Sequence, residues 1–284
     1  MEGRGFRLSK PGERAPGSDC STIARAAWMP PREMRRRQVL ALLGGLLLAP
    51  TAGVAFGQSG AFNPRVLVVG GQRPDDVRRS ALGRWSWELI RRTSAPGRLA
   101  TEMIAADDPK LLAEPFAIWV GDSSIPPLTA GEVRGLARFL RLGGMLVVDD
   151  SRPDSGAFGA EARRQLARVL PENPVVRLPE SHVIYKTYYI IDRPVGRVLG
   201  PSYLDAVVRG RNAQVVFVAH DLLGALARSR TGEWALEVEP GGFRQREYAV
   251  RLAVNLAMYL LCSDYKDDQV HAPWLMRRRA GRHP

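Results

Sequence analysis

The chain contains very little cysteine: Cys20 and Cys262 are the only two in 284 residues. Cys20 lies in a segment that we expect the mature protein to lack, so no intramolecular disulfide is expected. Cys262 ends an apolar run, and nothing in its sequence surroundings would stabilise a thiolate. We therefore predict a buried, unreactive thiol at this position.

Signatures of common catalytic and cofactor sites are also missing. The stretch "GDSSIPP" (121–127) does not form the G-x-S-x-G turn of a serine hydrolase. Gly70-Gly71 lacks the G-x-G-x-x-G spacing of a dinucleotide-binding loop. The sequence contains no His-x-x-His or paired-carboxylate spacing of the kind that is typical of a metal site. We therefore expect neither a bound metal ion nor a cofactor.

Positive charge is in excess, with 41 Lys and Arg against 29 Asp and Glu and a formal net charge of +12. In the body of the chain these cations are interspersed with acids, and no basic run is interleaved with aromatic residues, which argues against nucleic-acid binding. Arg209 and Arg211 precede a predicted strand, where they could hold a carboxylate or phosphate. Alternatively, they form ion pairs with Asp205 or Asp221.

The leader-like apolar run, residues 39–49, is interrupted at Pro50, well short of the roughly 20 residues that cross a bilayer. The basic stretch before it, "MRRRQVL" (34–40), resembles a twin-arginine export signal. Small residues then precede Gln58, as at a signal-peptide cleavage site. We expect residues 34–57 to be a cleaved signal peptide. A retained anchor is the alternative, and membrane association is expected only in that case.

The remaining segments differ in composition. Residues 1–33 are polar and rich in Pro and Gly, so they are either disordered or translated upstream of the true start at Met34. Residues 58–265 are expected to form a single α/β domain, since no linker interrupts them. Residues 266–284 are expected to be a basic polar tail. We expect an exported protein of the periplasm or cell envelope.

Short apolar runs alternate with amphipathic segments along the body of the chain. The runs typical of buried strands are 65–69, 116–120, 145–148, 175–178 and 214–219. The segments typical of helices are 75–93, 129–142, 160–170 and 243–261. This alternation predicts an α/β domain with a mainly parallel sheet.

Three details of the pattern are more specific. Thr129 and Glu132 form a capping box at the start of the second helix. Residues 188–211, rich in Gly and Pro, are expected to be irregular. The last helix is apolar on nearly all sides, which predicts that it is covered and that Asn255 binds a loop through hydrogen bonds.

Six stretches resemble, in order and spacing, the domain-of-unknown-function family 4159. They are "WELIRRTS" (87–94), "EPFAIWVGD" (114–122), "EVRGLARFLRLGGMLVVDD" (132–150), "LPESHVIYKTYY" (178–189), "GRNAQVVFVAHDL" (210–222) and "LAVNLAMYLL" (252–261). The resemblance covers residues 62–263. Only the first loop, "VVGGQRPDD" (68–76), departs from the Tyr- and Gly-rich run usual in the family.

The resemblance implies a three-layer α/β sandwich, flavodoxin-like and similar to class I glutamine amidotransferases. It also implies a bacterial envelope protein whose partners are linked to MoxR-family ATPases and von Willebrand A-type systems. The family has no established activity. Amidotransferases need a cysteine on a sharp turn after a strand, and no predicted strand here is followed by one, so the fold would lack its nucleophile.

Polar residues follow several predicted strands, and a parallel sheet would gather them at its carboxyl edge. The candidates for catalysis are Asp149, Asp150, His182 and Asp221, and those for ligand binding are Asp122, Tyr185, Arg211 and His220. A histidine beside carboxylates would have a raised pKa and could carry a proton. The alternative is that the aspartates cap helices and that His182 anchors its own loop.

These observations lead to two functional hypotheses. The first is a non-enzymatic module that binds a ligand or partner on an amidotransferase-like fold without its nucleophile. The alternative is a hydrolase-type enzyme that uses an Asp/His crevice at the strand ends. The two differ in one respect: an enzyme requires the candidate side chains to converge in one cleft.

Overall fold

The computed structural model of the chain describes residues 61–210 and 212–280. The upstream segment, the predicted signal peptide, Cys20 and Arg211 lie outside these residues. Among the helices within them, none is both long enough and apolar enough to cross a membrane.

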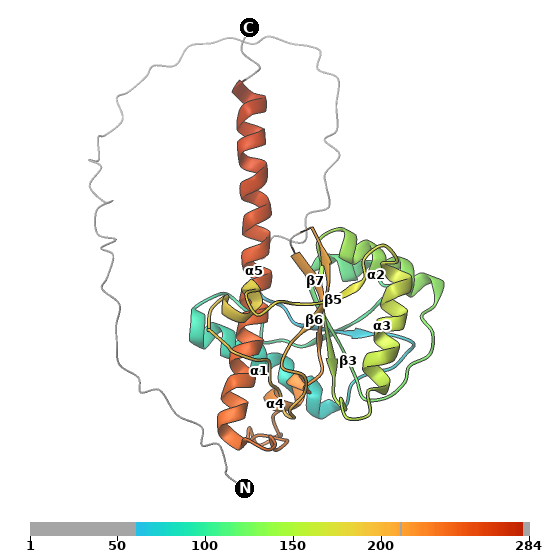
Figure 1. Cartoon of the computed structure of the whole chain (residues 1–284), viewed down its shortest axis with the longest axis vertical. Helices are drawn as coiled ribbons and strands as arrows, with labels where there is room; N and C mark the ends of the chain where they lie inside the picture. The colour runs from blue at the N-terminus through green and yellow to red at the C-terminus, as the bar shows by residue number, and fades with distance from the viewer. Residues whose placement is uncertain (1–60, 211, 281–284) are drawn as a thin grey trace, which may run out of the picture. The chain divides into compact units, whose positions relative to one another are not determined.

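A seven-stranded sheet with the order β2-β1-β3-β4-β7-β6-β5 forms the centre of the fold (Figure 1). Its strands are β1 (Arg65–Val68), β2 (Glu102–Ala105), β3 (Phe116–Gly121), β4 (Met145–Asp150), β5 (Val175–Arg177), β6 (Asp205–Arg209) and β7 (Asn212–Val218). The strands β2, β1, β3, β4 and β7 are parallel to one another, whereas β6 pairs antiparallel with both β7 and β5. The predicted α/β class and mainly parallel sheet are therefore confirmed.

Helices cover both faces of the sheet (Figure 1). On one face lie α1 (Asp76–Thr93), α4 (Leu222–Leu226) and α5 (Gly242–Ala280), and on the other lie α2 (Ala130–Arg141) and α3 (Ala157–Val169). In β3, Phe116 and Ile118 pack toward α1 and α5, while Ala117 and Trp119 pack toward α2 and α3. Because both faces are buried, the central strands consist of unbroken apolar runs.

Some elements were not expected from the sequence. Only Ile104 is buried in β2, which lies at the edge of the sheet, so no apolar run marks this strand. The strand β6 falls within 188–211, which we expected to be irregular. Two short 3-10 helices, η1 (Pro109–Ala113) and η2 (Val183–Lys186), also occur. Each is too short to show a periodic pattern.

The last helix, α5, differs from its prediction at its carboxyl end. It continues to Ala280, whereas the apolar pattern predicted an end near Leu261. Helical backbone bonds do not require an apolar face, so the loss of that pattern does not end a helix. Cys262 is exposed, and the prediction of a buried thiol was wrong. The described buried positions of α5 end at Leu260.

Asn255, in the buried part of α5, anchors the segment that follows η2. Its Oδ1 accepts hydrogen bonds from the N–H groups of Tyr188 at 3.2 Å and Tyr189 at 2.8 Å. Its Nδ2 donates to the carbonyl oxygens of Ile184 at 2.9 Å and Tyr189 at 2.8 Å. The side chain is fully buried. The predicted structural role of Asn255 is therefore confirmed.

Leu256 tests whether α5 belongs to the core, since its side chain is fully buried. Replacing Leu256 with Ala should lower the free energy of unfolding by about 2–5 kcal/mol, because a cavity remains. Phe243→Ala, at a position 79% exposed on the same helix, is the control and should cost less than about 0.5 kcal/mol. Denaturant unfolding followed by circular dichroism measures both. Equally small losses would show that α5 is peripheral.

Candidate functional site

Asp149, near the carboxyl end of β4, is completely buried. Its two carboxylate oxygens accept hydrogen bonds from the backbone N–H groups of Leu222 and Leu223, each at 2.8 Å. These N–H groups begin α4 and have no partner inside that helix. Asp149 therefore holds α4 against the sheet, and both of its oxygens are used within the fold.

Asp221, which precedes α4, is also completely buried. Arg78 of α1 binds it in bidentate fashion, with Nε–Oδ1 and Nη2–Oδ2 distances of 2.8 Å. Arg197 forms a second ion pair with Oδ2, and the N–H of Gly224 donates to Oδ1 at 3.1 Å. Asp221 thus joins α1, α4 and the loop that contains Arg197.

The second aspartate of β4 is likewise engaged by its own loop. Asp150 accepts hydrogen bonds from the N–H groups of Arg152 at 2.9 Å and Gly159 at 3.1 Å. Burial raises the pKa of Asp150. Asp122, which follows β3, is exposed and so stands apart from these buried carboxylates.

His220 is enclosed at the same edge. Its Nε2 lies 2.9 Å from the carbonyl oxygen of Pro201, while Nδ1 has no hydrogen-bond partner among the described residues. A Cβ added at Gly196 would lie 2.2 Å from the carbonyl oxygen of His220, and one added at Gly200 would lie 3.0 Å from its ring. Burial lowers the pKa of His220 to about 4. The ring is therefore neutral at neutral pH and tightly packed.

His182 does not join this group. It caps η2, where its Nδ1 accepts a hydrogen bond from the N–H of Ile184 at 3.3 Å. Its ring centroid lies 5.8 Å from that of Tyr259, whose hydroxyl binds the N–H of Ala213 at the start of β7. Asp149 pairs with Val218 at the opposite end of β7. The segment carrying His182 therefore returns to the amino edge, and the expected four-residue crevice does not form.

The other candidates are equally scattered. Tyr185 is buried, and its hydroxyl accepts a hydrogen bond from the N–H of Leu204 at 2.8 Å, so it packs in the core.

Burial lowers the pKa of His182, as it does that of His220, so the expectation of a raised histidine pKa was wrong. No group of three or more His, Cys, Asp or Glu residues in the described ranges has the geometry of a metal site.

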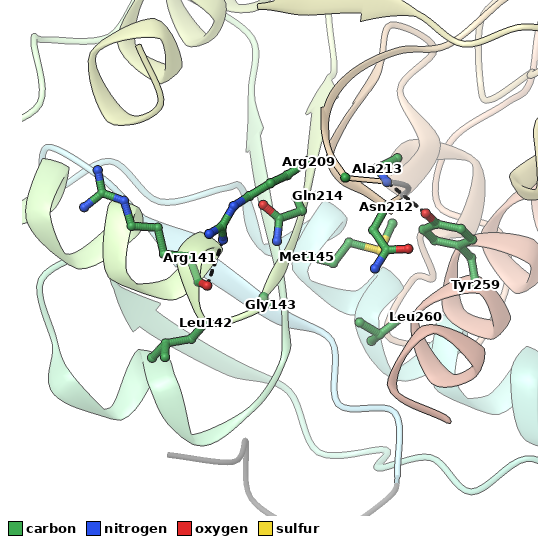
Figure 2. Close-up of a pocket in the computed structure, with 12 residues that line it drawn as sticks. Arg141, Leu142, Gly143, Met145, Arg209, Asn212, Ala213, Gln214, Tyr259 and Leu260 are labelled. Atoms are coloured by element: carbon green, nitrogen blue, oxygen red, sulfur yellow. Dashed lines mark hydrogen bonds between the residues drawn. The ribbon is translucent and has the colours of Figure 1, made fainter. Parts of the chain in front are cut away.

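A cavity of about 500 Å³ lies instead at the amino edge of the sheet (Figure 2). It forms where α2 ends, β4 and β7 begin, and the antiparallel β6 ends. The residues that line it include Arg141, Met145, Arg209, Asn212, Gln214 and Tyr259.

Two exposed arginines, Arg141 and Arg209, line this cavity; in Figure 2 the Arg209 side chain runs toward the carbonyl oxygen of Arg141, and the Arg141 side chain points away from Gln214. Neither forms an ion pair with an acid among the side chains described, those of residues 61–210 and 212–262. Arg209 donates instead to the carbonyl oxygen of Arg141 at 2.8 Å. An uncompensated pair of guanidiniums offers charged, planar donors to a carboxylate or phosphate.

Gln214 supplies a buried acceptor in the same cavity. Its side chain is 8% exposed, and its Nε2 donates to the carbonyl oxygen of Leu140 at 2.8 Å. Its Oε1 is buried and has no hydrogen-bond partner among the described residues. Since an unpartnered buried acceptor is costly, a ligand with an O–H or N–H donor would satisfy it.

Sequence reasoning identified Arg209 as a candidate anion-binding residue but missed Arg141 and Gln214. Arg141 ends a helix, and Gln214 begins an apolar strand, so neither lies in a recognisable motif. The pairing of β4 with β7 brings them to one edge. The available signal was a polar Gln at the start of an otherwise apolar strand.

The comparisons with known proteins identify a family but no reaction. The sequence matches the family described as "Domain of unknown function (DUF4159)" over residues 65–261. The match therefore includes both the carboxyl-edge aspartates and the amino-edge cavity. Comparison with curated proteins finds no match.

The buried position of Asp149 generates a prediction about pH. Burial, reinforced by the nearby carboxylate of Asp221, raises the pKa of Asp149 to about 7. In the unfolded chain this pKa is about 3.9. Between the two values the folded protein retains a proton that the unfolded chain releases, so the stability contribution of Asp149 falls as pH rises.

Asp149→Asn cannot ionise and should escape this loss. Its stability relative to the unsubstituted protein should therefore improve by at least about 1 kcal/mol as pH is raised from about 5 to about 7.5. Denaturant unfolding at several pH values measures the change, with the exposed Asp122→Asn as the control. A stability difference that does not change with pH would contradict the assignment.

Proposed function

The chain belongs to the family described as "Domain of unknown function (DUF4159)", and from this premise we propose that it is a non-enzymatic binding module. Its ligand carries an anionic group and occupies the cavity at the amino edge of the sheet. The proposal rests on one contrast: the buried aspartates of the carboxyl edge are bound within the fold, whereas the amino-edge guanidiniums have no acid partner among the described side chains.

The hydrogen bonds and ion pairs that Asp149 and Asp221 form within the fold argue against the hydrolase alternative. A general base must reach the proton that it removes, directly or through one water. Asp149 and Asp221 are completely buried, and their oxygens are held by backbone N–H groups and arginines. His182 lies at the other edge, so no Asp/His pair of the expected kind is available.

The proposed fold assignment has support from the strand order. The parallel strands follow the order β2-β1-β3-β4-β7, which corresponds to the 2-1-3-4-5 order of flavodoxin-like sheets. No cysteine follows β1, β3, β4 or β7 in the sequence. The chain thus fits an amidotransferase-like fold that has lost its nucleophile.

The proposed location is the bacterial cell envelope. The basic and apolar segment at 34–57 supports export by the twin-arginine route. The proposed partners are envelope proteins linked to MoxR-family ATPases and von Willebrand A-type systems, as the family resemblance implies. A binding module without catalytic groups is suited to such assemblies.

The cavity defines which groups its ligand must carry. Arg141 and Arg209 favour carboxylate or phosphate oxygens, because these accept two parallel N–H bonds from one guanidinium. Gln214 Oε1 requires a donor. Inorganic phosphate near neutral pH offers both anionic oxygens and a P–O–H group, whereas sulfate offers only anionic oxygens.

Isothermal titration of the full-length chain with phosphate and sulfate tests the proposal. Phosphate should bind more tightly than sulfate, because only phosphate donates to Gln214. The double variant Arg141→Gln/Arg209→Gln should weaken phosphate binding at least about tenfold, because charge-assisted hydrogen bonds are lost. Arg73→Gln, at an exposed arginine of the carboxyl edge, is the single-charge control and should bind almost as well as the unsubstituted chain.

Two results would count against the proposal. One is phosphate binding that Arg141→Gln/Arg209→Gln leaves unchanged. The other is hydrolysis of p-nitrophenyl esters or phosphates by the purified chain that Asp149→Asn abolishes without unfolding it. The second result would establish the enzyme alternative.

A further inference from the structure

A second hollow adjoins the amino-edge cavity and extends its positive charge. It has a volume of about 420 Å³ and lies between α2 and the end of α3. It shares Arg141 and Leu142 with the first cavity. Its other charged lining residues are Arg134, Arg138 and Arg168, and none of the residues that line it is acidic.

The arginines of α2 form a stripe along one side of this helix. Arg134, Arg138 and Arg141 are spaced by four and three residues, so they share a face. All three are exposed, and their guanidinium groups form no ion pair within the described ranges. In contrast, Arg163 on α3 pairs with Asp205 at 2.9 Å, so nearby acids do neutralise arginines elsewhere on this surface.

We propose that the arginine groove, made by Arg134, Arg138, Arg141, Arg168 and Arg209, binds an extended acidic segment of a partner protein. The proposal rests on the binding function assigned to the amino-edge cavity and names its partner class. Carboxylates of the segment pair with the guanidiniums along α2. A backbone N–H group of the segment donates to Gln214 Oε1.

The spacing of the stripe fits an extended peptide. Arg134 and Arg138 are four residues apart on a helix, which separates their backbones by about 6 Å along the axis. In an extended chain, side chains on one face recur every two residues, or about 6.6 Å. Alternate acidic residues of a strand-like segment can therefore reach successive arginines of α2.

The surroundings of the stripe favour a peptide over a flat or stacked partner. The arginines line two hollows, and a hollow suits an inserted chain better than a planar membrane surface. No Trp, Phe or Tyr lines the hollow beside α2, so stacking of nucleic-acid bases has no platform there. On the other side of the stripe, Asp107 and Asp108 line a separate hollow with Arg134 and Arg138. Their negative charge directs an acidic segment toward α3.

Fluorescence anisotropy with the full-length chain tests this inference. The probe is a labelled peptide of alternating Glu and Ala, and the matched control peptide has Gln in place of Glu. The Glu peptide should bind and the Gln peptide should not, and added salt should weaken binding because the rim charges are solvent-exposed. Arg134→Gln/Arg138→Gln should weaken binding at least about fivefold.

The control variant is Arg73→Gln/Arg230→Gln, which removes the same charge at exposed arginines outside the groove. It should change the affinity for the Glu peptide less than about twofold. Equal losses in the two double variants would overturn the groove as the binding site. Preferential binding to phosphatidylglycerol vesicles or to single-stranded DNA through Arg134 and Arg138 would overturn the partner class.

The phosphate titration separates this inference from the proposed function. If phosphate binds through Arg141 and Arg209 but the Glu peptide does not bind, the acidic-segment inference fails and the binding function stands. If neither probe binds, both fail. Arg134→Gln/Arg138→Gln should leave phosphate affinity nearly unchanged, because neither residue lines the amino-edge cavity.

Discussion

The carboxyl edge of the sheet depends on the ion pairs that the carboxylate of Asp221 forms with two arginines. This carboxylate is completely buried, and two arginines from different parts of the chain, Arg78 and Arg197, bind it. Removing one partner of such a buried cluster leaves uncompensated charge, at a cost of about 3–5 kcal/mol. Together with Asp149, which holds the first turn of α4, Asp221 closes the edge where α/β folds commonly place their ligands. The polar groups there maintain the fold.

At the carboxyl edge the buried aspartates are bound by arginines and backbone N–H groups, whereas at the amino edge arginine side chains lack acid partners among the described residues. At the amino edge, Arg141 and Arg209 have no acid partner within the described ranges, and Gln214 presents a buried, unsatisfied oxygen. These features are costly in an isolated protein, because like charges repel and an unpartnered acceptor loses its hydrogen bond with water. A bound acidic ligand removes both costs. The proposed recognition surface therefore lies at the amino edge of the sheet, while the carboxyl edge maintains the fold.

The central elements could be predicted because local and tertiary requirements agree in them. Strands such as β3 are buried on both faces and are continuous apolar runs, and the Thr129–Glu132 capping box marks the start of α2. The edge strand β2 could not be predicted, because only Ile104 is buried in it. The strand β6, which lies between β7 and β5, has only three apolar residues between Asp205 and Arg209, too short a run to mark a strand. The position of His182 depends on the path of a long irregular segment, which no local pattern specifies. Likewise, only the sheet register brings Arg141 and Gln214 together.

Hydrogen–deuterium exchange of the full-length chain, with and without the Glu–Ala peptide, tests the division between the two edges most directly. Backbone amides buried by a ligand exchange more slowly, whereas those of an uninvolved edge keep their rates. Binding at the amino edge predicts slower exchange in residues 134–145 and 212–215 and unchanged exchange in residues 219–226. Slower exchange in residues 219–226, with no change in residues 134–145, would contradict it and would place recognition at the carboxyl edge.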